Sequence, residues 1–229
     1  MAALAVLFGS IVQAVTGFGF GLVSAPFLVA AYGAPEGVQI SLVVGAVLNV
    51  LLLAPSWRRA DRPAVLRLLL PAVVATVAVG LVVRGEKNDG LTVLAGALCL
   101  VGVLIVARGR TFARLGGRGG AAITGALSGA MSVMTGVGGP PVVLFGATAG
   151  WAPEVSRPTL QLFFLGSGLV AIATLGLPPD LPWVTMGAMV AGTAIGHPLT
   201  RRLHADYVRV AVLVVAGAGS LLAIVRGLA

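Results

Sequence analysis

Thr16-Gly17-Phe18-Gly19-Phe20-Gly21 is the stretch on which the fold depends, because a second copy follows later in the chain. The second copy is Thr135-Gly136-Val137-Gly138-Gly139, and Pro140-Pro141 comes directly after it. Each copy lies inside an apolar run and is followed, after a similar interval, by the tripeptide Ala-Pro-Glu, at 34–36 and at 152–154. This pattern indicates a gene duplication, and it suggests that the two glycine-rich breaks are the functional centre.

The composition is that of a membrane protein. Of the 229 residues, 58% are hydrophobic and only 10% are charged, whereas a soluble domain is about half apolar and about a quarter charged. Several uncharged runs reach about 18 residues, the length that a membrane-spanning helix needs. In a membrane, the 33 glycines and 13 prolines suit close packing of helices and deliberate helix breaks. Scattered glycines such as Gly96, Gly102, Gly187 and Gly192 are expected to be packing positions.

The charged residues exclude several classes of function. The net charge of +8 comes from arginines in short loops between apolar runs, where they indicate topology rather than nucleic-acid binding. All seven carboxylates lie in loops or at the ends of apolar runs, which argues against a cation pump. The sequence has no metal-ligand spacing of Cys and His, no nucleophile–base arrangement and no phosphate-binding loop. We therefore expect no enzyme activity, no cofactor, no metal and no nucleic-acid partner.

Residues 2–32 and 121–150 are apolar segments of similar length, each broken near its centre by one of the glycine-rich copies. As one straight helix, residues 2–32 would be about 46 Å long, against a hydrocarbon core of about 30 Å. Two arms of about 12–14 residues could instead enter the membrane, turn at the glycines and leave on the same side. The remaining apolar runs predict six ordinary spans, with a glycine-rich linker at 116–120 between the halves: 37–55, 65–83, 91–107, 158–176, 183–199 and 207–225.

Loop charge discriminates between two arrangements of the broken segments. If both segments cross the membrane, the arginine-rich loops fall on both sides of it. If both are re-entrant hairpins, nearly all of the arginines lie on one side, and only Arg84, Lys87 and Arg226 lie on the other. The second arrangement obeys the positive-inside rule better, and it makes the arginine-rich loops cytoplasmic. Two kinked full spans remain the alternative.

The sequence thus predicts an all-α membrane protein made of two inverted repeats. Each repeat is a broken or re-entrant helical hairpin plus three transmembrane helices, with seven or eight spans in total by hydropathy. Residues 1–113 form the first repeat and residues 119–229 the second. Each repeat then makes an odd number of complete crossings, so the two halves insert with opposite orientation. Many secondary transporters follow this plan and bind substrate near the middle of the membrane, at the repeat interface.

The helix breaks are candidate anion sites. The second arm of each hairpin begins there, and its first N–H groups have no partner within the helix while its dipole is positive. Two such helix starts, converging from opposite sides, could hold a small anion without a buried cation. The Thr16 and Thr135 hydroxyls could add donors, and Gln13, Asn49 and Gln161 supply amides within the apolar segments. The same residues could instead serve close helix packing or interhelical hydrogen bonds.

The candidate substrate-binding residues are those of the two breaks together with the three amides: Thr16, Gly17, Phe18, Gly19, Gly21, Gln13, Asn49, Thr135, Gly136, Gly138, Gly139, Pro140 and Gln161. Other polar residues also lie within predicted spans or hairpin arms, namely Gln39, Ser41, Ser132, Ser167 and Thr193. Single serines and threonines in such positions are more typical of interhelical contacts.

At its two glycine clusters, the chain resembles the TauE/SafE family of membrane permeases, also called sulfite-exporter-like transporters. That family looks like two homologous halves, each opening with an apolar segment that is broken by a G-x-G-G-type motif and followed by a proline. The likeness covers nearly the whole chain, although the first cluster has Phe18 and Phe20 between its glycines and the second has two prolines where a third glycine could stand. The matching residues are Gly17, Gly19, Gly21 and Pro26 in the first half and Gly136, Gly138, Gly139, Pro140 and Pro141 in the second.

The resemblance implies a permease for small sulfur-containing or organic anions, such as sulfite, sulfonates or carboxylates. From the residues and the resemblance together, we expect a secondary transporter of the inner cell membrane that works by alternating access. A passive anion channel of the same architecture and a non-transporting membrane scaffold are the alternatives. The expected partners are a small anionic substrate and the lipid bilayer, and assembly as a homodimer is left open.

Overall fold

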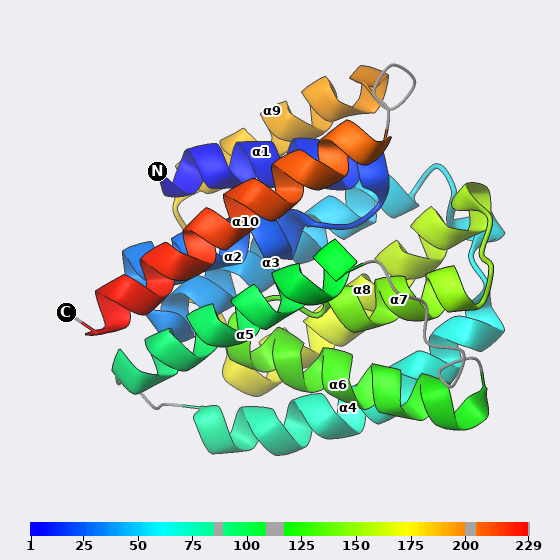
Figure 1. Ribbon diagram of the computed structural model, residues 1–229, viewed down its shortest axis with the longest axis horizontal. Helices are drawn as coiled ribbons and strands as arrows, with labels where there is room; N and C mark the ends of the chain where they lie inside the picture. The colour runs from blue at the N-terminus through cyan, green and yellow to red at the C-terminus, as the bar shows by residue number, and fades with distance from the viewer. Residues whose placement is uncertain (85–88, 109–116, 200–204, 229) are drawn as a thin grey trace.

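The computed structural model describes residues 1–84, 89–108, 117–199 and 205–228 (Figure 1). Every regular element within these ranges is a helix, which confirms the all-α prediction. A short 3-10 turn lies at Trp57–Arg59. The α-helices follow in the order α1 (Ala2–Thr16), α2 (Phe20–Tyr32), α3 (Ala34–Leu53), α4 (Arg62–Val83), α5 (Asp89–Arg108), α6 (Arg118–Thr135), α7 (Gly139–Thr148), α8 (Pro153–Leu175), α9 (Trp183–Leu199) and α10 (Ala205–Leu228).

Three of the described helices, α3, α4 and α8, are long and apolar enough to cross a membrane. Shorter apolar helices include α1, α2 and α7. The outward face of α4 is apolar along its length, because Leu66, Leu70, Val74 and Leu81 are all exposed. An outward apolar face of this size suits contact with lipid rather than with water. The fold is therefore consistent with the predicted membrane protein.

The largest difference from the predicted spans is at the start of α8. The helix begins at Pro153 rather than at residue 158, so Pro158 lies inside it. A proline at the start and Glu154 in the first turn both favour a helix N-terminus. The α3 helix begins in the same way, with Pro35 and Glu36 in its first turn. The two Ala-Pro-Glu tripeptides therefore take corresponding places, each at the start of a long helix.

The predicted linker at 116–120 is wrong for its last three residues. Helix α6 begins at Arg118, whereas residue 116 lies outside the described residues. Glycines at 119 and 120 are poor helix formers, so packing of α6 against α4 overrides the local preference. Gly125 and Gly129 let α6 approach α4 closely, because a Cβ atom at these positions would lie 2.1 Å from the Leu68 carbonyl oxygen and 2.3 Å from that of Ala72.

Both broken segments form helical hairpins. Helix α2 returns alongside α1, since Ser24 Oγ donates to the Ala5 carbonyl (3.1 Å) near the open end and Phe20 N donates to Gln13 Oε1 (3.1 Å) near the turn. In the second segment, the Ser128 hydroxyl of α6 donates to the Gly138 carbonyl at the start of α7. The arms are less equal than predicted: α1 has 15 residues and α2 has 13, whereas α6 has 18 and α7 has 10.

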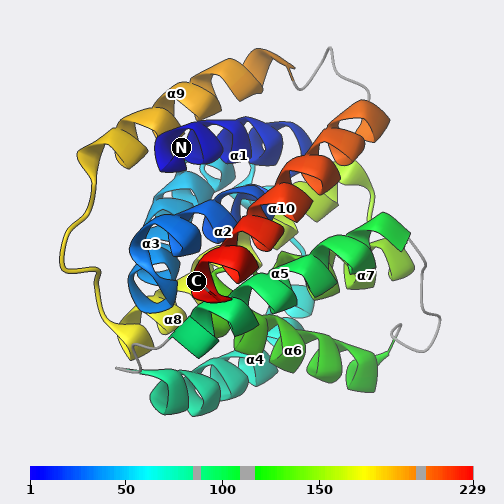
Figure 2. The ribbon, with the colours of Figure 1, turned by 60° about the vertical axis from the view of Figure 1, so that its left-hand side comes forward.

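The helices pack in pairs that link the two halves of the chain (Figure 2). Helix α1 lies along α9, and α6 lies along α4, while α3 packs on α8 and α5 on α10. Two of these pairs use the same device, which is two glycines one turn apart that face the neighbouring helix. In α9 they are Gly192 and Gly196, which face α1, and in α6 they are Gly125 and Gly129, which face α4. Glycine in these places allows the backbones to approach, which drives helix association in a membrane.

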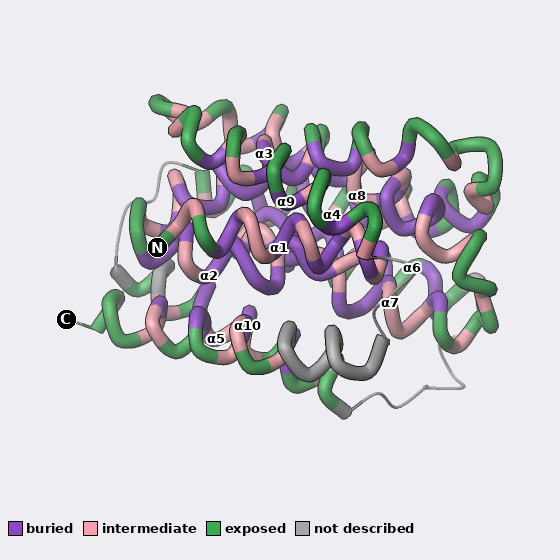
Figure 3. Tube along the Cα trace, turned by 90° about the horizontal axis from the view of Figure 1, so that it is seen from above, coloured by how far each residue is buried: buried purple, intermediate pink, exposed green. Residues whose placement is uncertain are grey.

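Buried residues follow the inner faces of the helices, and exposed residues lie on the outer faces (Figure 3). The scattered glycines largely fit the packing role predicted for them. Gly96 faces α10, Gly102 faces Pro140, and Gly192 faces the Leu7 carbonyl. Gly187 differs, because nothing lies within 4 Å of its added Cβ position.

Candidate functional site

The first break is a left-handed turn that only glycine adopts readily. Gly17 ends α1 with φ 88° and ψ −4°, and its N–H donates to the Gln13 carbonyl (2.8 Å). The next turn is held by Phe18 N, which donates to Thr16 Oγ1 (3.3 Å). Gly19 also has a positive φ, of 107°, and the α2 helix starts directly after it. The chain therefore reverses within the three residues from 17 to 19.

The second break repeats most of this geometry. Gly136 ends α6 with φ 73° and ψ 8°, its N–H donates to the Ser132 carbonyl (2.8 Å), and Val137 N donates to Thr135 Oγ1 (3.0 Å). The difference comes at Gly138, where φ is −95°. Helix α7 then opens with Gly139 and two prolines. Because proline has no N–H, the start of α7 offers fewer main-chain donors than the start of α2.

The two breaks are in direct backbone contact although they lie in different halves of the chain. A Cβ atom on Gly21 would lie 2.6 Å from the Gly136 carbonyl oxygen, and one on Gly136 would lie 3.1 Å from Ser41 Cβ. A side chain at Gly21 would force the two breaks apart, and one at Gly136 would press on the Ser41 side chain of α3. The glycines of the repeated motif therefore permit the close approach of one hairpin tip to the other.

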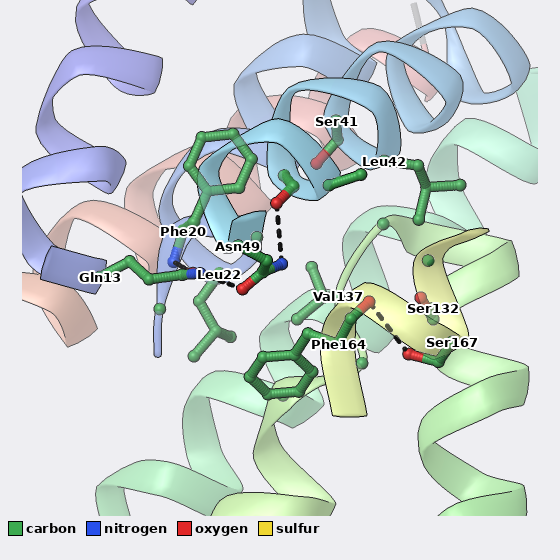
Figure 4. A pocket seen from close by; sticks show the side chains of 18 residues that line it. Gln13, Phe20, Leu22, Ser41, Leu42, Asn49, Ser132, Val137, Phe164 and Ser167 are labelled. Carbon is green, nitrogen blue, oxygen red and sulfur yellow. Dashed lines mark hydrogen bonds between the residues drawn. The ribbon is translucent and has the colours of Figure 1, made fainter. Parts of the chain in front are cut away.

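A cavity lies beside this contact (Figure 4). The volume open to the centre of a water molecule is about 60 Å³, several times the ~10–15 Å³ that one water needs. The predicted site residues that line it come from both halves: Gln13, Gly19, Gly21, Asn49, Gly136, Gly138 and Gly139. The other predicted site residues are not part of its lining: Thr16, Gly17, Phe18, Thr135, Pro140 and Gln161.

The threonines of both breaks face their own backbone. Thr135 Oγ1 donates to the Met131 carbonyl (2.7 Å), and Thr16 Oγ1 lies 2.9 Å from the Val12 carbonyl and 2.6 Å from that of Phe18. Each hydroxyl also accepts the turn N–H described above. These bonds engage the hydroxyls in stabilising the turns, so they are not aimed at the cavity as donors.

A buried amide network holds the first hairpin on α3 (Figure 4). Gln13 Nε2 donates to Asn49 Oδ1 (2.8 Å), and Asn49 Nδ2 donates to the Gly45 carbonyl (2.8 Å). Gln13 Oε1 accepts from Phe20 N, the first amide of α2.

Ser41, one turn before Gly45, lines the same cavity, is 2% exposed, and its Oγ has no hydrogen-bond partner. Such an unpaired buried hydroxyl is rare in proteins.

Main-chain donors at the start of α2, rather than positive side chains, make this cavity suited to an anion. None of its lining residues is charged. The N–H groups of Gly21 and Leu22, in the first turn of α2, have no partner within the helix, whose first backbone bond is from Val23 N to the Gly19 carbonyl (3.1 Å). The dipole of α2 adds a partial positive charge there. Across the described residues, no cluster of His, Cys, Asp and Glu could hold a metal ion.

A family model described as Sulfite exporter TauE/SafE matches residues 2–223. The chain belongs to the TauE/SafE family. No curated protein and no solved structure matches it. The family match covers both glycine-rich breaks and all the helices up to residue 223 of α10, which confirms the resemblance seen at the glycine clusters.

TauE/SafE proteins form a family of membrane transporters described as sulfite exporters. Membership supports the prediction of a transport protein in a membrane, and at the level of the family it agrees with a function other than catalysis. In this TauE/SafE chain, the central cavity at the two breaks is the candidate place for the transported solute.

Sequence reasoning missed part of the lining of the cavity in this TauE/SafE chain. The sequence marks Ser41, Ser132 and Ser167 as polar residues without assigning them to the site, and the additional lining residues are Phe20, Leu22, Leu42, Gly45, Ala46, Val137, Phe164 and Gly168. One signal could have found several of them. Residues 41, 45 and 49 recur at intervals of four, so they lie on the same face of α3 as the predicted Asn49.

Proposed function

We propose that the chain is a secondary transporter for small sulfur-containing or organic anions, such as sulfite, sulfonates or carboxylates, which bind between the two helix breaks. The observation that carries the proposal is the contact of Gly21 with the Gly136 carbonyl beside an uncharged cavity, in a chain of the TauE/SafE family. The cavity has room for a solute of a few heavy atoms. Its position at the junction of the two halves is where many secondary transporters bind substrate.

The chemistry of the cavity favours an anion over a cation. The free N–H groups at the start of α2 and the helix dipole stabilise negative charge. Ser41 offers an unpaired hydroxyl, and the carboxamides of Gln13 and Asn49 lie on the same wall. No carboxylate lines the cavity to repel an anion or to hold a metal ion or proton. Neutral donors also avoid the cost of burying a cation when the site is empty.

The pairing of helices supports two inverted repeats, residues 1–113 and 119–229. The duplication relates α1 to α6 and α4 to α9. Under that exchange, the observed pair α1–α9 becomes the observed pair α6–α4, while α3–α8 and α5–α10 each map onto themselves. This is the behaviour of a two-fold relation between halves. Rocking of one half against the other around the breaks would open the cavity to alternate sides.

The distribution of charge along the bundle supports re-entrant hairpins and cytoplasmic arginine-rich loops. Arg59 and Arg157 line a cavity at the end where α8 starts, whereas the last turn of α10, which contains Arg226, lies at the end with both chain termini (Figure 1). We expect cysteines at residues 36 and 58 to be labelled by an impermeant reagent from opposite sides of the membrane, with a tag at Met1 on the side of residue 36. A tag at Met1 on the side opposite to residue 36 would exclude the hairpin topology.

The test of the function is concentrative flux. Purified full-length chain is reconstituted in liposomes, and radiolabelled sulfite is followed under imposed ion gradients and membrane potentials. We expect accumulation of sulfite against its own gradient, above that in empty liposomes. Flux that only dissipates the sulfite gradient would identify a passive channel. If the protein causes no flux of sulfite, a sulfonate or a small carboxylate, the proposal is rejected and the non-transporting scaffold is favoured.

A further inference from the structure

A second and larger cavity lies at the end of the bundle where the α3–α4 connection meets the start of α8. Its volume is about 410 Å³, against about 60 Å³ for the cavity at the breaks. It takes its lining from α1, α3, α8 and α9 as well as from the connection. Its polar side chains are Ser56, Arg59, Glu154, Arg157, Gln161, Thr193 and His197.

Two guanidinium groups of this cavity have no acidic partner in the described residues. Arg59 is exposed and Arg157 is half-buried, and no ion pair between described residues involves either of them. Their neighbours Arg58 and Arg62 differ, because both lie over the Trp57 ring, at 5.5 Å and 4.8 Å from its centre. The fork of donors on a guanidinium matches the oxygen atoms of an oxyanion.

Gln161 adds an unpaired buried group to the same wall. It is 4% exposed, it lines the cavity, and its Oε1 has no hydrogen-bond partner. Buried polar atoms without a partner are rare, and this one lies in the wall of a cavity where a ligand can reach it. A half-turn of the carboxamide exchanges its acceptor for its two N–H donors, which lets the side chain donate to an anion that enters the cavity.

The two cavities lie end to end along the same helices. On α1, Gln13 lines the cavity at the breaks and Ala14 lines the larger one. On α8, Phe164 lines the first and Gln161, one turn nearer the helix start, lines the second. The larger cavity therefore adjoins the cavity at the breaks on the side where α8 starts.

Arg157 stands at the junction. A Cβ atom on Gly17 would lie 2.7 Å from Arg157 Cγ and 3.3 Å from its Cα, so the turn of the first break rests on the stem of this arginine. The stem packs on the tip of the hairpin while its side chain lines the larger cavity. A charge in this place concentrates anions next to the break, because cavity walls of low dielectric constant focus its field.

We propose that the larger cavity is an anion-binding antechamber, in which Arg157 and Gln161 bind a small oxyanion before it passes the first break. Arg59, at the mouth, strengthens the attraction. The inference rests on the proposed transport function for its role in the pathway, but binding in the antechamber can be measured separately. The ligand class is an anion with two or more oxygen atoms on one centre, which a guanidinium can bind in a bidentate manner.

Transport kinetics test the role of Arg157. We expect Arg157→Gln to raise the KM for sulfite about tenfold or more, because the variant attracts and binds the anion less well. The maximal rate should stay close to that of the wild type, because translocation itself is unchanged. The matched control is Arg58→Gln, which removes the same charge from the same end of the bundle but lies on Trp57 and outside the cavity lining. Its KM should remain within twofold of the wild type. Equal shifts in the two variants would overturn the antechamber.

Equilibrium binding of radiolabelled sulfite to the purified full-length chain separates this inference from the proposed function. It is measured in an Asn49→Leu background, which weakens the site at the breaks, and Arg157→Gln and Gln161→Leu are each added to this background. Binding that survives Asn49→Leu and is then lost with Arg157→Gln or Gln161→Leu supports the antechamber, even if no flux is found. Binding that both variants leave unchanged, in folded and monodisperse protein, overturns it.

Discussion

We expect Gly21→Ala to reduce sulfite flux about tenfold or more, since displacement of binding groups by about 1 Å is enough for such losses. The added methyl group would lie 2.6 Å from the Gly136 carbonyl oxygen, which is part of the backbone and has no flexible end to move. The tips of the two hairpins must then separate, at a cost of about 1–3 kcal/mol for overpacking. Initial rates of sulfite uptake into liposomes, at equal amounts of reconstituted protein, measure the effect.

The control for Gly21→Ala is Gly187→Ala on α9. Nothing lies within 4 Å of the Cβ position at Gly187, and alanine favours helix more than glycine does, so folding should not suffer. Flux should match that of the wild type. If Gly21→Ala transports sulfite as fast as Gly187→Ala, contact between the breaks does not matter for transport.

We expect Asn49→Leu to lower both the stability of the protein and its affinity for sulfite. The substitution leaves Gln13 Nε2 buried without its 2.8 Å partner, and an unpaired buried donor costs about 1–3 kcal/mol. Gln13 also fixes the first amide of α2 through Oε1, so the side chain that anchors the start of α2 loses one of its own supports. Thermal unfolding in detergent should shift to lower temperature, and the KM for sulfite should rise.

Thr76→Val is the matched control for Asn49→Leu. Thr76 is fully buried in α4 and its Oγ1 has no hydrogen-bond partner, so its removal leaves nothing unpaired. We expect the unfolding temperature to be equal to or higher than that of the wild type, since loss of an unsatisfied hydroxyl is neutral or stabilising. The KM for sulfite should stay the same as in the wild type. The proposed role of the amide network fails if Asn49→Leu behaves as Thr76→Val does.

Much of the local structure could be predicted from the sequence because it depends on short-range chemistry. Thr-Gly ends a helix in both copies, through a left-handed glycine and a threonine that accepts the turn N–H. Ala-Pro-Glu begins the following long helix in both copies. The start of α6 at Arg118 could not be predicted, because glycine disfavours helix locally and contact with α4 decides the outcome.

The position of each residue along its helix, relative to the two cavities, limited the prediction of the site. Gln161 and Phe164 are one turn apart on α8, yet only Phe164 lines the cavity at the breaks, while Gln161 lines the larger one. Tertiary packing sets where along a helix each cavity begins and ends, and no local signal records it. The role of Ser41 could not be predicted for a different reason. Single serines in spans are mostly interhelical contacts, and only the three-dimensional structure shows that its hydroxyl has no hydrogen-bond partner.

The position of a bound anion is the most direct measurement of whether the two breaks hold the transported solute. Selenite has the shape of sulfite, and its selenium can be located by anomalous scattering in a crystal of the full-length chain. We predict a peak in the cavity between Gly21 and Gly136, with oxygens about 3 Å from the free amides of α2. Selenium bound only elsewhere, with this cavity closed or empty at saturating selenite, would contradict the account.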